Sequence, residues 1–308
     1  MEPIRIAVVG LGKIARDQHL PALQANPQFA LAATVCPFGA TAEGLPAFAT
    51  LGELLASGIP LDAAAICTPP QVRHRLASEA LARGLHVLLE KPPAANLSEA
   101  DALAELAAEA GCTIFTAWHS RFAAGVEPAR EWLADRRILG ATITWREDVR
   151  VWHPGQAWIW QPGGFGVFDP GINALSIATR ILPGPLTLTG AELEFPANRE
   201  APIAARLSLR LASGAPVAAD FDFRQTGAQT WDIEVETDHG TLRLAQGGAA
   251  LTVPSGTHRA GDAEYPALYA RFAELVRSGT SEVDTAPLRL VADAFLRGRA
   301  MRTVAFHD

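Results

Sequence analysis

A lysine beside two prolines is the first residue whose setting indicates chemistry. Lys91 lies in the segment 90–93 (EKPP), directly after an apolar stretch at 85–89 that is typical of a buried strand. Ligands of open α/β sheets bind outside the carboxyl ends of the strands, and the prolines restrict the backbone that carries the amine. An amine held there can take or give a proton. The alternative is a lysine paired with Glu90 or exposed to solvent, the common state of this residue type.

A carboxylate and an amide lie four residues apart in the segment 169–173 (DPGIN). If a helix begins at Asp169, its side chain and that of Asn173 share one face. The carboxylate can take part in proton transfer. Because the amide does not titrate, Asn173 is better suited to orient a hydroxyl group than to act as an acid or base.

A glycine-rich turn occupies residues 10–15 (GLGKIA), between a predicted strand and a predicted helix. This is the setting of the G-x-G-x-x-G/A turn that binds dinucleotides. Gly10 permits the tight turn, Gly12 lets the backbone approach a pyrophosphate, and Ala15 lets helix and strand pack closely. The N-terminus of the helix offers free N–H groups and a partial positive charge to the phosphates. We therefore expect a dinucleotide cofactor here rather than a structural turn alone.

The end of the second predicted strand should distinguish NAD from NADP. An acidic residue there would bind the ribose 2′-hydroxyl of NAD, and a nearby arginine would accept the 2′-phosphate of NADP. The sequence has CPFG at 36–39, with neither. This favours NAD, while NADP stays open because Lys13 and Arg16 lie close to the turn. Expected cofactor-binding residues are Gly10, Gly12, Lys13, Ile14, Pro37, Thr68, Pro69, Glu90 and Lys91, where Thr68 and Pro69 end another predicted strand and line the nicotinamide ribose.

The elements that position these residues alternate regularly in the first third of the chain. Ser98 with Asp101 resembles a capping box at the start of one helix. The alternation predicts a parallel sheet with right-handed crossovers, and its apolar strands are typical of a sheet covered on both faces. Strands are predicted at 4–9, 29–35, 63–67, 85–89 and 112–116, and helices at 14–25, 71–83 and 99–110.

After about residue 120 the hydrophobic pattern changes to period two, as at 207–211 and 231–235. Such alternation predicts an antiparallel sheet with one face against a core. Helices are predicted near 126–135, 169–181, 264–277 and 287–299. The chain is therefore expected to be an α/β protein, with an N-terminal Rossmann domain (1–120) and a C-terminal α+β domain (121–308) that has a large open, mostly antiparallel sheet. An open sheet face often packs against a second copy, so we expect a homodimer.

Composition excludes several classes of protein. Of the 308 residues, 49% are hydrophobic, which is enough for two domains with cores of their own. The formal net charge of −7 and the lack of a basic run argue against a nucleic-acid or membrane partner. Cys36, Cys67 and Cys112 are scattered and form no metal-binding pattern, so we expect buried thiols, no metal site and a reducing, cytoplasmic compartment. The sequence shows no signal peptide and no apolar run of transmembrane length.

Three motifs carry a resemblance to a known family: GLGKIA at 10–15, CTPP at 67–70 and EKPP at 90–93. Together they resemble the glucose-fructose oxidoreductase / inositol dehydrogenase / MocA (Gfo/Idh/MocA) family, over nearly the whole chain. The resemblance implies a Rossmann domain, an α+β domain with an open sheet, NAD(P) as cofactor, and a D-x-x-x-H motif beside the EKP lysine. The usual histidine of that motif is Asn173 in this chain.

The DPGIN segment, with WHPGQ at 152–156 and WIW at 158–160, resembles the bacterial L-arabinose 1-dehydrogenase / D-galactose 1-dehydrogenase branch of that family. This resemblance implies oxidation of a free aldose at C1 to the lactone, with Lys91 at the reacting hydroxyl. Trp158 and Trp160 are expected in the core or an interface. The implied sugar contacts are His119, Glu147, Trp152, Asp169, Asn173 and Trp231.

Several alternatives stay open at the level of residues. His119 is either a satisfied histidine at a strand end or a residue that faces the cleft. Glu147 lies within a predicted strand, where exposure to solvent or pairing with Arg146 or Arg150 would also account for it. The proton acceptor is either Lys91, whose neutral form a cationic nicotinamide favours, or Asp169.

Two other functions compete with aldose oxidation. One is oxidation or reduction at another carbon of a sugar or polyol, against which Asn173 in place of histidine argues. The other is a non-catalytic sugar or nucleotide sensor on the same fold. The presence of Lys91 and Asp169, without an added DNA-binding segment, argues against a sensor.

Overall fold

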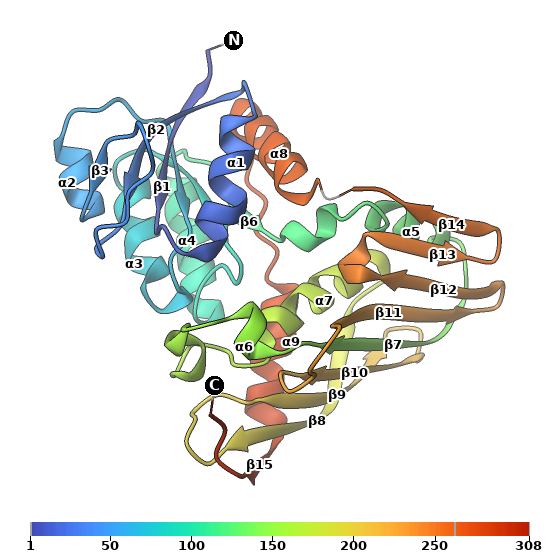
Figure 1. Ribbon diagram of the computed structural model, residues 1–308. Helices are drawn as coiled ribbons and strands as arrows, with labels where there is room; N and C mark the ends of the chain where they lie inside the picture. The colour runs from blue at the N-terminus through green and yellow to red at the C-terminus, as the bar shows by residue number, and fades with distance from the viewer. Residues whose placement is uncertain (1, 262, 308) are drawn as a thin grey trace. The chain divides into compact units, whose positions relative to one another are not determined.

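The computed structural model describes residues 2–261 and 263–307 (Figure 1). Contacts divide the chain into two compact units. The first comprises Met1–Trp118 and Tyr265–Thr285, and the second comprises His119–Glu264 and Ala286–Asp308. The predicted division into 1–120 and 121–308 has a single boundary between the domains. It therefore omits the return of Tyr265–Thr285 to the first unit. A helical pattern in a sequence does not reveal which sheet the helix covers.

A six-stranded parallel sheet forms the centre of the first unit, in the order β3-β2-β1-β4-β5-β6. This confirms the predicted Rossmann sheet. The order reverses at β1 and β4, the point at which doubly wound sheets bind ligands. The strands are β1 (Ile4–Val9), β2 (Phe29–Val35), β3 (Ala47–Phe48), β4 (Ala63–Ile66), β5 (His86–Glu90) and β6 (Ile114–Ala117).

Three helices bury apolar side chains against one face of this sheet: α2 (Leu51–Ala56), α3 (Pro70–Leu81) and α4 (Leu97–Glu109). The predicted capping box at Ser98 and Asp101 is wrong. The cap of α4 is Asn96, whose side chain accepts the N–H of Glu99, while the Glu99 carboxylate accepts the N–H of Ala95. Asn96 has the extended backbone of an N-cap residue, whereas Ser98 already lies inside the helix.

The opposite face of the sheet is covered by α1 (Leu20–Gln24) and α8 (Glu264–Ser278), which lie side by side in Figure 1. Phe272 of α8 stacks between Phe29 of β2 and Phe115 of β6, at centroid distances of 6.1 and 6.2 Å. Beyond α8, Glu282 bonds the backbone of β6, donating to the Ile114 carbonyl at 3.0 Å. The returning segment therefore supplies both a helix and a cover for the β6 edge.

The second unit is built on a nine-stranded sheet in the order β14-β13-β12-β11-β7-β10-β9-β8-β15. The sheet is mostly antiparallel, as predicted; β10 with β7 and β15 with β8 are parallel pairs. In β9 the alternation of buried leucines and exposed polar residues from 206 to 211 is confirmed. The strands are β7 (Ile138–Arg146), β8 (Leu186–Pro196), β9 (Ala204–Leu211), β10 (Pro216–Asp222), β11 (Thr230–Thr237), β12 (Gly240–Ala245), β13 (Ala250–Val253), β14 (Gly256–Arg259) and β15 (Arg299–Thr303).

Helices cover one face of the nine-stranded sheet: α5 (Val126–Leu133), α7 (Phe168–Ile181) and α9 (Ala286–Arg297), while the short α6 (Val149–Trp152) follows β7. The final strand β15 was not predicted, because its first residue was included in the helix at 287–299. Within the described residues, 2–261 and 263–307, no helix combines the length and apolar character needed to span a bilayer.

The uncovered face of this sheet carries paired charges. Arg146 of β7 bonds Asp220 of β10 at 2.6 Å, Arg224 bonds Glu194 of β8 at 2.9 Å, and Arg243 of β12 bonds Asp232 of β11 at 2.7 Å. Cross-strand pairs of opposite charge contribute modestly to sheet stability. They also make this face polar, with acidic and basic side chains side by side.

A glycine-rich turn places the start of α7. Gly166 has φ +52°, and a Cβ there would lie 2.3 Å from the Pro202 carbonyl oxygen, so no other residue fits. Pro170 occupies the first turn of α7, where its missing N–H costs nothing. Gly171 brings the helix against Phe221 of β10, since a Cβ there would be 2.9 Å from the ring.

A glycine-to-alanine pair separates backbone strain from steric conflict at this turn. Gly214 also has positive φ, at +94°, but a Cβ there would meet nothing within 4 Å. Gly214→Ala should lower the free energy of unfolding by about 1 kcal/mol through left-handed strain. Gly166→Ala should cost about 1–3 kcal/mol more, because it also displaces the backbone at residue 202. Urea denaturation measures both; equal losses would show that the close approach at Gly166 has no energetic role.

Candidate functional site

The glycine turn of the first unit has the shape that a dinucleotide requires. Gly10 has φ +96°, and a Cβ there would lie 2.9 Å from Thr68 Cγ2 and 3.0 Å from its backbone nitrogen. A Cβ on Gly12 would meet no atom within 4 Å, so the backbone is approachable at this point. Ala15 is fully buried under the sheet. The turn therefore fits the pyrophosphate of a nicotinamide dinucleotide, as the sequence predicts for these positions.

The helix that follows the turn contains a π-helical segment, Ala15–His19, before α1. Such a segment adds one residue to a helical turn and redirects the side chains after it, often at functional sites. Its last residue, His19, is fully buried. Lys13 is exposed and forms an ion pair with Asp17, and Ile14 is half-buried at the start of the helix.

Pro37 is the second residue after the end of β2, and its neighbour Phe38 is 93% exposed. Thr68 and Pro69 connect β4 to α3, next to the glycine turn. The Thr68 hydroxyl oxygen is buried and has no hydrogen-bond partner among the residues that the structure describes. These predicted cofactor residues therefore gather at the carboxyl ends of β1, β2 and β4.

Lys91 directly follows the carboxyl end of β5, in a loop whose carbonyl groups are bonded by a buried arginine. Arg73 of α3, 3% exposed, donates from Nη1 to the carbonyls of Glu90, at 2.6 Å, and Pro92, and from Nη2 to the carbonyl of Thr68. The Lys91–Pro92 peptide bond is cis. A planar guanidinium with several donors suits this task, because it bonds carbonyls of two neighbouring loops at once.

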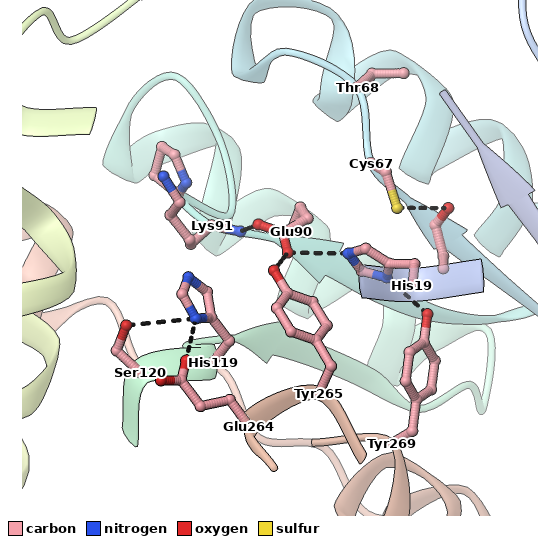
Figure 2. Close-up of polar contacts among 12 residues, drawn as sticks. His19, Cys67, Thr68, Glu90, Lys91, His119, Ser120, Glu264, Tyr265 and Tyr269 are labelled. Atoms are coloured by element: carbon pink, nitrogen blue, oxygen red, sulfur yellow. Dashed lines mark hydrogen bonds and ion pairs between the residues drawn. The ribbon is translucent and has the colours of Figure 1, made fainter. Parts of the chain in front are cut away.

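The side chain of Glu90 points into the first unit rather than along the loop (Figure 2). Its Oε1 accepts the Tyr265 hydroxyl at 2.7 Å and lies 3.0 Å from His19 Nε2, while its Oε2 accepts the Lys91 backbone N–H at 2.8 Å. Burial acts to lower the pKa of His19, but the Cys67 and Glu90 side chains outweigh it and raise that pKa to about 10. His19 and Glu90 thus form a buried ion pair.

In the second unit, the predicted helix at 169–181 is confirmed as α7, which begins one residue earlier at Phe168. Asp169 lies in its first turn and is 4% exposed. The helix dipole stabilises a carboxylate at this end. Asn173 is one turn later on the same face, and its Oδ1 is buried with no hydrogen-bond partner in the described part of the chain. An amide oxygen in that state is suited to accept a hydroxyl donor.

A chain of polar contacts leads to Asp169. Trp231 of β11 donates from Nε1 to Glu147 Oε2 at 2.9 Å, and Glu147 Oε1 lies 3.0 Å from His153 Nε2. His153 Nδ1 is 3.7 Å from Asp169 Oδ2. Glu147 and Asp169 are both buried, so the imidazole lies between two carboxylates that solvent screens little.

The alternative pairings of Glu147 are wrong. Glu147 follows the end of β7 instead of lying within a strand, and it is 2% exposed. Arg146 pairs with Asp220 and Arg150 with Asp148, so neither neighbour takes the Glu147 carboxylate.

The four predicted tryptophans differ in their exposure and in the rings they contact. Trp152, at the end of α6, is 37% exposed, and its ring centroid lies 4.8 Å from that of Trp231. Trp231 in turn stacks on Trp145 at 5.9 Å. Trp160 is 4% exposed and packs on Phe223, whereas Trp158 is half-buried.

His119 begins the second unit two residues after β6. Its Nδ1 lies 2.6 Å from Glu264 Oε2 and 3.4 Å from the Ser120 hydroxyl (Figure 2). The ring is therefore oriented by a carboxylate, which fixes its Nδ1 toward Glu264. Both alternatives for His119 from the sequence remain compatible with this contact.

Sequence reasoning missed three residues that bond the predicted site residues or their backbone. His153 lies next to Trp152 in the motif that carries the resemblance, and a histidine between a tryptophan and a proline was a usable signal. Nothing in the sequence indicates that His19 and Arg73 are buried, because polar residues in helices are mostly exposed. Their roles depend on the faces that π-helical geometry and α3 packing turn inward.

Comparison with known proteins agrees with this geometry. The family described as an oxidoreductase family with an NAD-binding Rossmann fold (GFO_IDH_MocA) matches residues 4–118. A galactose 1-dehydrogenase from Pseudomonas fluorescens is 48% identical over 310 residues, covering 100% of both chains. The chain belongs to the Gfo/Idh/MocA family of oxidoreductases.

Two solved structures share the fold of this chain over almost its whole length. The crystal structure of a D-galactose-1-dehydrogenase from Rhizobium etli superposes with a TM-score of 0.95 at 52% identity, over 100% of this chain and 99% of that one. A 3-ketoreductase from Actinomadura kijaniata, solved with NADP and TDP-benzene, has a TM-score of 0.87 at 21% identity, over 98% and 99%. The second likeness shows the shared fold only.

The buried His19–Glu90 pair should make stability depend on alkaline pH. Because the pKa of His19 rises from 6.5 to about 10 on folding, its contribution is fully present below pH 6.5 and is lost as pH rises toward 10. The wild-type free energy of unfolding should therefore fall between pH 7 and pH 10. Urea denaturation of His19→Gln over the same range should show a shallower fall. Parallel curves for the two proteins would contradict a charged His19.

Proposed function

We propose that this protein is an NAD(P)-dependent aldose 1-dehydrogenase that oxidises the C1 hydroxyl of a free sugar of the D-galactose or L-arabinose type to the lactone. The observation that carries the proposal is the acceptor cluster of the second unit. Trp231, which packs on Trp152, bonds the buried Glu147 carboxylate, and His153 links Glu147 to the buried Asp169 carboxylate. The buried Asn173 amide oxygen lies one turn after Asp169 on α7. A free sugar offers the complement, with hydroxyl donors around its rim and apolar C–H faces.

Similarity over the full length supports this substrate class. The two galactose 1-dehydrogenases match the whole chain at 48% and 52% identity, with no part of either unit left out. The second unit, which carries the acceptor cluster, is therefore covered as fully as the first.

In this proposal the glycine turn would hold the nicotinamide cofactor, which would supply the hydride acceptor for C1. Lys91 or Asp169 takes the proton of the C1 hydroxyl. Asn173 and Glu147 hold the other hydroxyls and so orient C1. His153 sits between Glu147 and Asp169 and keeps both carboxylates in place.

For the cofactor we propose a preference for NAD over NADP. Pro37 and the exposed Phe38 follow β2, where an arginine would be needed to bind a 2′-phosphate. Lys13 is engaged by Asp17, which lessens its charge toward a phosphate. Pro37, Thr68, Pro69 and the turn residues would contact the cofactor.

We also propose a cytoplasmic homodimer. Cys36, Cys67 and Cys112 are buried free thiols, in keeping with a reducing compartment. The uncovered face of the nine-stranded sheet, with its alternating charges, is the candidate contact between two copies. Sedimentation of the purified protein at two salt concentrations tests the assembly.

A substrate panel tests the reaction. Galactose, arabinose and other aldoses are each incubated with NAD or NADP, and the absorbance of the reduced nicotinamide is followed. We expect turnover with an aldopentose or aldohexose, a lactone as product, and a higher kcat/KM with NAD. Inositol and other polyols, which lack an anomeric hydroxyl, serve as controls. Cofactor binding without turnover of any aldose would refute the proposed reaction.

The proton acceptor can be identified by chemical rescue. Lys91→Ala should lower kcat by about a hundredfold or more if the amine lies in the proton path, and near-normal turnover would remove it from the chemistry. Added primary amines should restore part of the activity of Lys91→Ala if the lysine is the base. Added formate should do so for Asp169→Ala if the carboxylate is the base. Rescue of one variant alone assigns the role.

A further inference from the structure

A buried polar network adjoins the backbone of Lys91 in the first unit (Figure 2). It consists of His19, Glu90, Tyr265 and Tyr269. All four side chains are 3% exposed or less. Tyr265 and Tyr269 are the two tyrosines of the whole sequence, and both face this network from one side of α8. Burying two hydroxyls and an ion pair is costly unless each group is bonded, so the arrangement has to be specific.

Each member bonds the next in a continuous path. Tyr269 Oη lies 2.7 Å from His19 Nδ1, and His19 Nε2 lies 3.0 Å from Glu90 Oε1. Tyr265 donates its hydroxyl to the same Oε1 at 2.7 Å. A charged His19 donates from both ring nitrogens, so Tyr269 accepts one of them. The carboxylate oxygen Oε1 is therefore held from two directions.

The other carboxylate oxygen connects the network to Lys91. Oε2 of Glu90 accepts the Lys91 backbone N–H at 2.8 Å. Arg73 holds the carbonyls of Glu90 and Pro92, on either side of the lysine. The backbone of residue 91 is thus fixed by its neighbours' polar groups, and a shift of the Glu90 carboxylate moves the point from which the amine extends.

The network also joins three separate parts of the chain. His19 ends the π-helical segment that follows the glycine turn, Glu90 ends β5, and Tyr265 begins the segment that returns to the first unit. Cys67, at the end of β4, is the remaining titratable group that faces His19. The turn expected to hold the cofactor and the loop that carries Lys91 therefore share one buried support.

We propose that Tyr265 and His19, acting through the Glu90 carboxylate, are positioning residues for Lys91. The role rests on the proposed function, in which the Lys91 amine acts on the substrate hydroxyl. Each fixes the carboxylate that bonds the Lys91 backbone. Errors of about 1 Å in the placement of a reacting group can lower turnover about a hundredfold, which gives this support a functional consequence beyond stability.

Removal of one hydroxyl tests the proposal. Tyr265→Phe keeps the buried ring and deletes the bond to Oε1. We expect kcat to fall about tenfold or more, while KM for the sugar and Kd for NADH, measured by its fluorescence, stay within about twofold. Tyr269→Phe is the matched control, on the same helix and equally buried, because its hydroxyl reaches His19 and not Glu90. Its kcat should fall by less. Equal losses in the two variants would overturn the assignment to the Tyr265–Glu90 bond.

A second measurement reads the position of Lys91 without turnover. The sequence contains two lysines, Lys13 and Lys91, so reductive methylation with ¹³C-formaldehyde gives two lysine signals in an NMR spectrum. With NAD bound and no sugar, the Lys91 signal should shift in Tyr265→Phe, and the Lys13 signal should not. A Lys91 signal identical to that of the wild type would overturn the positioning role, whatever happens to kcat.

The two measurements also separate this inference from the proposed function. If the wild type oxidises no aldose but Tyr265→Phe still moves the Lys91 signal, the proposed reaction fails and the support of Lys91 by Tyr265 stands. If aldoses are oxidised and the signal does not move, the reverse holds.

Discussion

The buried carboxylate of Glu90 is the constraint on which the geometry around Lys91 depends. A carboxylate at 3% exposure is stable only when partners replace its hydration, and here an imidazole, a phenol and a backbone N–H do so. Those partners come from three distant parts of the chain. The return of Tyr265–Thr285 to the first unit is therefore more than a topological detail, because it brings the phenol that completes the set.

The second unit also stabilises buried carboxylates, but with different partners. Glu147 and Asp169 are buried carboxylates too, and the imidazole of His153 lies between them, while the indole of Trp231 satisfies the far oxygen of Glu147. Both units thus place acidic side chains at or next to the ends of strands and helices. Backbone groups at such ends lack a partner within the element and can bond a side chain. In each unit a histidine that the sequence did not single out lies beside the buried acid.

Small residues determine where these groups stand. Gly10 is confined by Thr68, Gly166 by Pro202 and Gly171 by Phe221, and in each case a Cβ would meet another atom at 2.9 Å or less. The first sets the turn at the end of β1, and the other two set the start of α7. The geometry of the glycine turn and the position of Asp169 therefore depend on steric contact as well as on hydrogen bonds.

From the sequence alone, the local patterns determined the parallel sheet of the first unit, the alternating strands of the second, the glycine turn and the family resemblance. These features depend on residues near one another in the chain, so periodicity and motif spacing report them directly. The tertiary structure decided the rest: that Glu90 turns inward, that Asn96 rather than Ser98 caps α4, and that His153 lies between Glu147 and Asp169. It also decided that residues 265–285 return to the first unit. Contacts between distant segments depend on which face of each element is buried, and no local pattern contains that information.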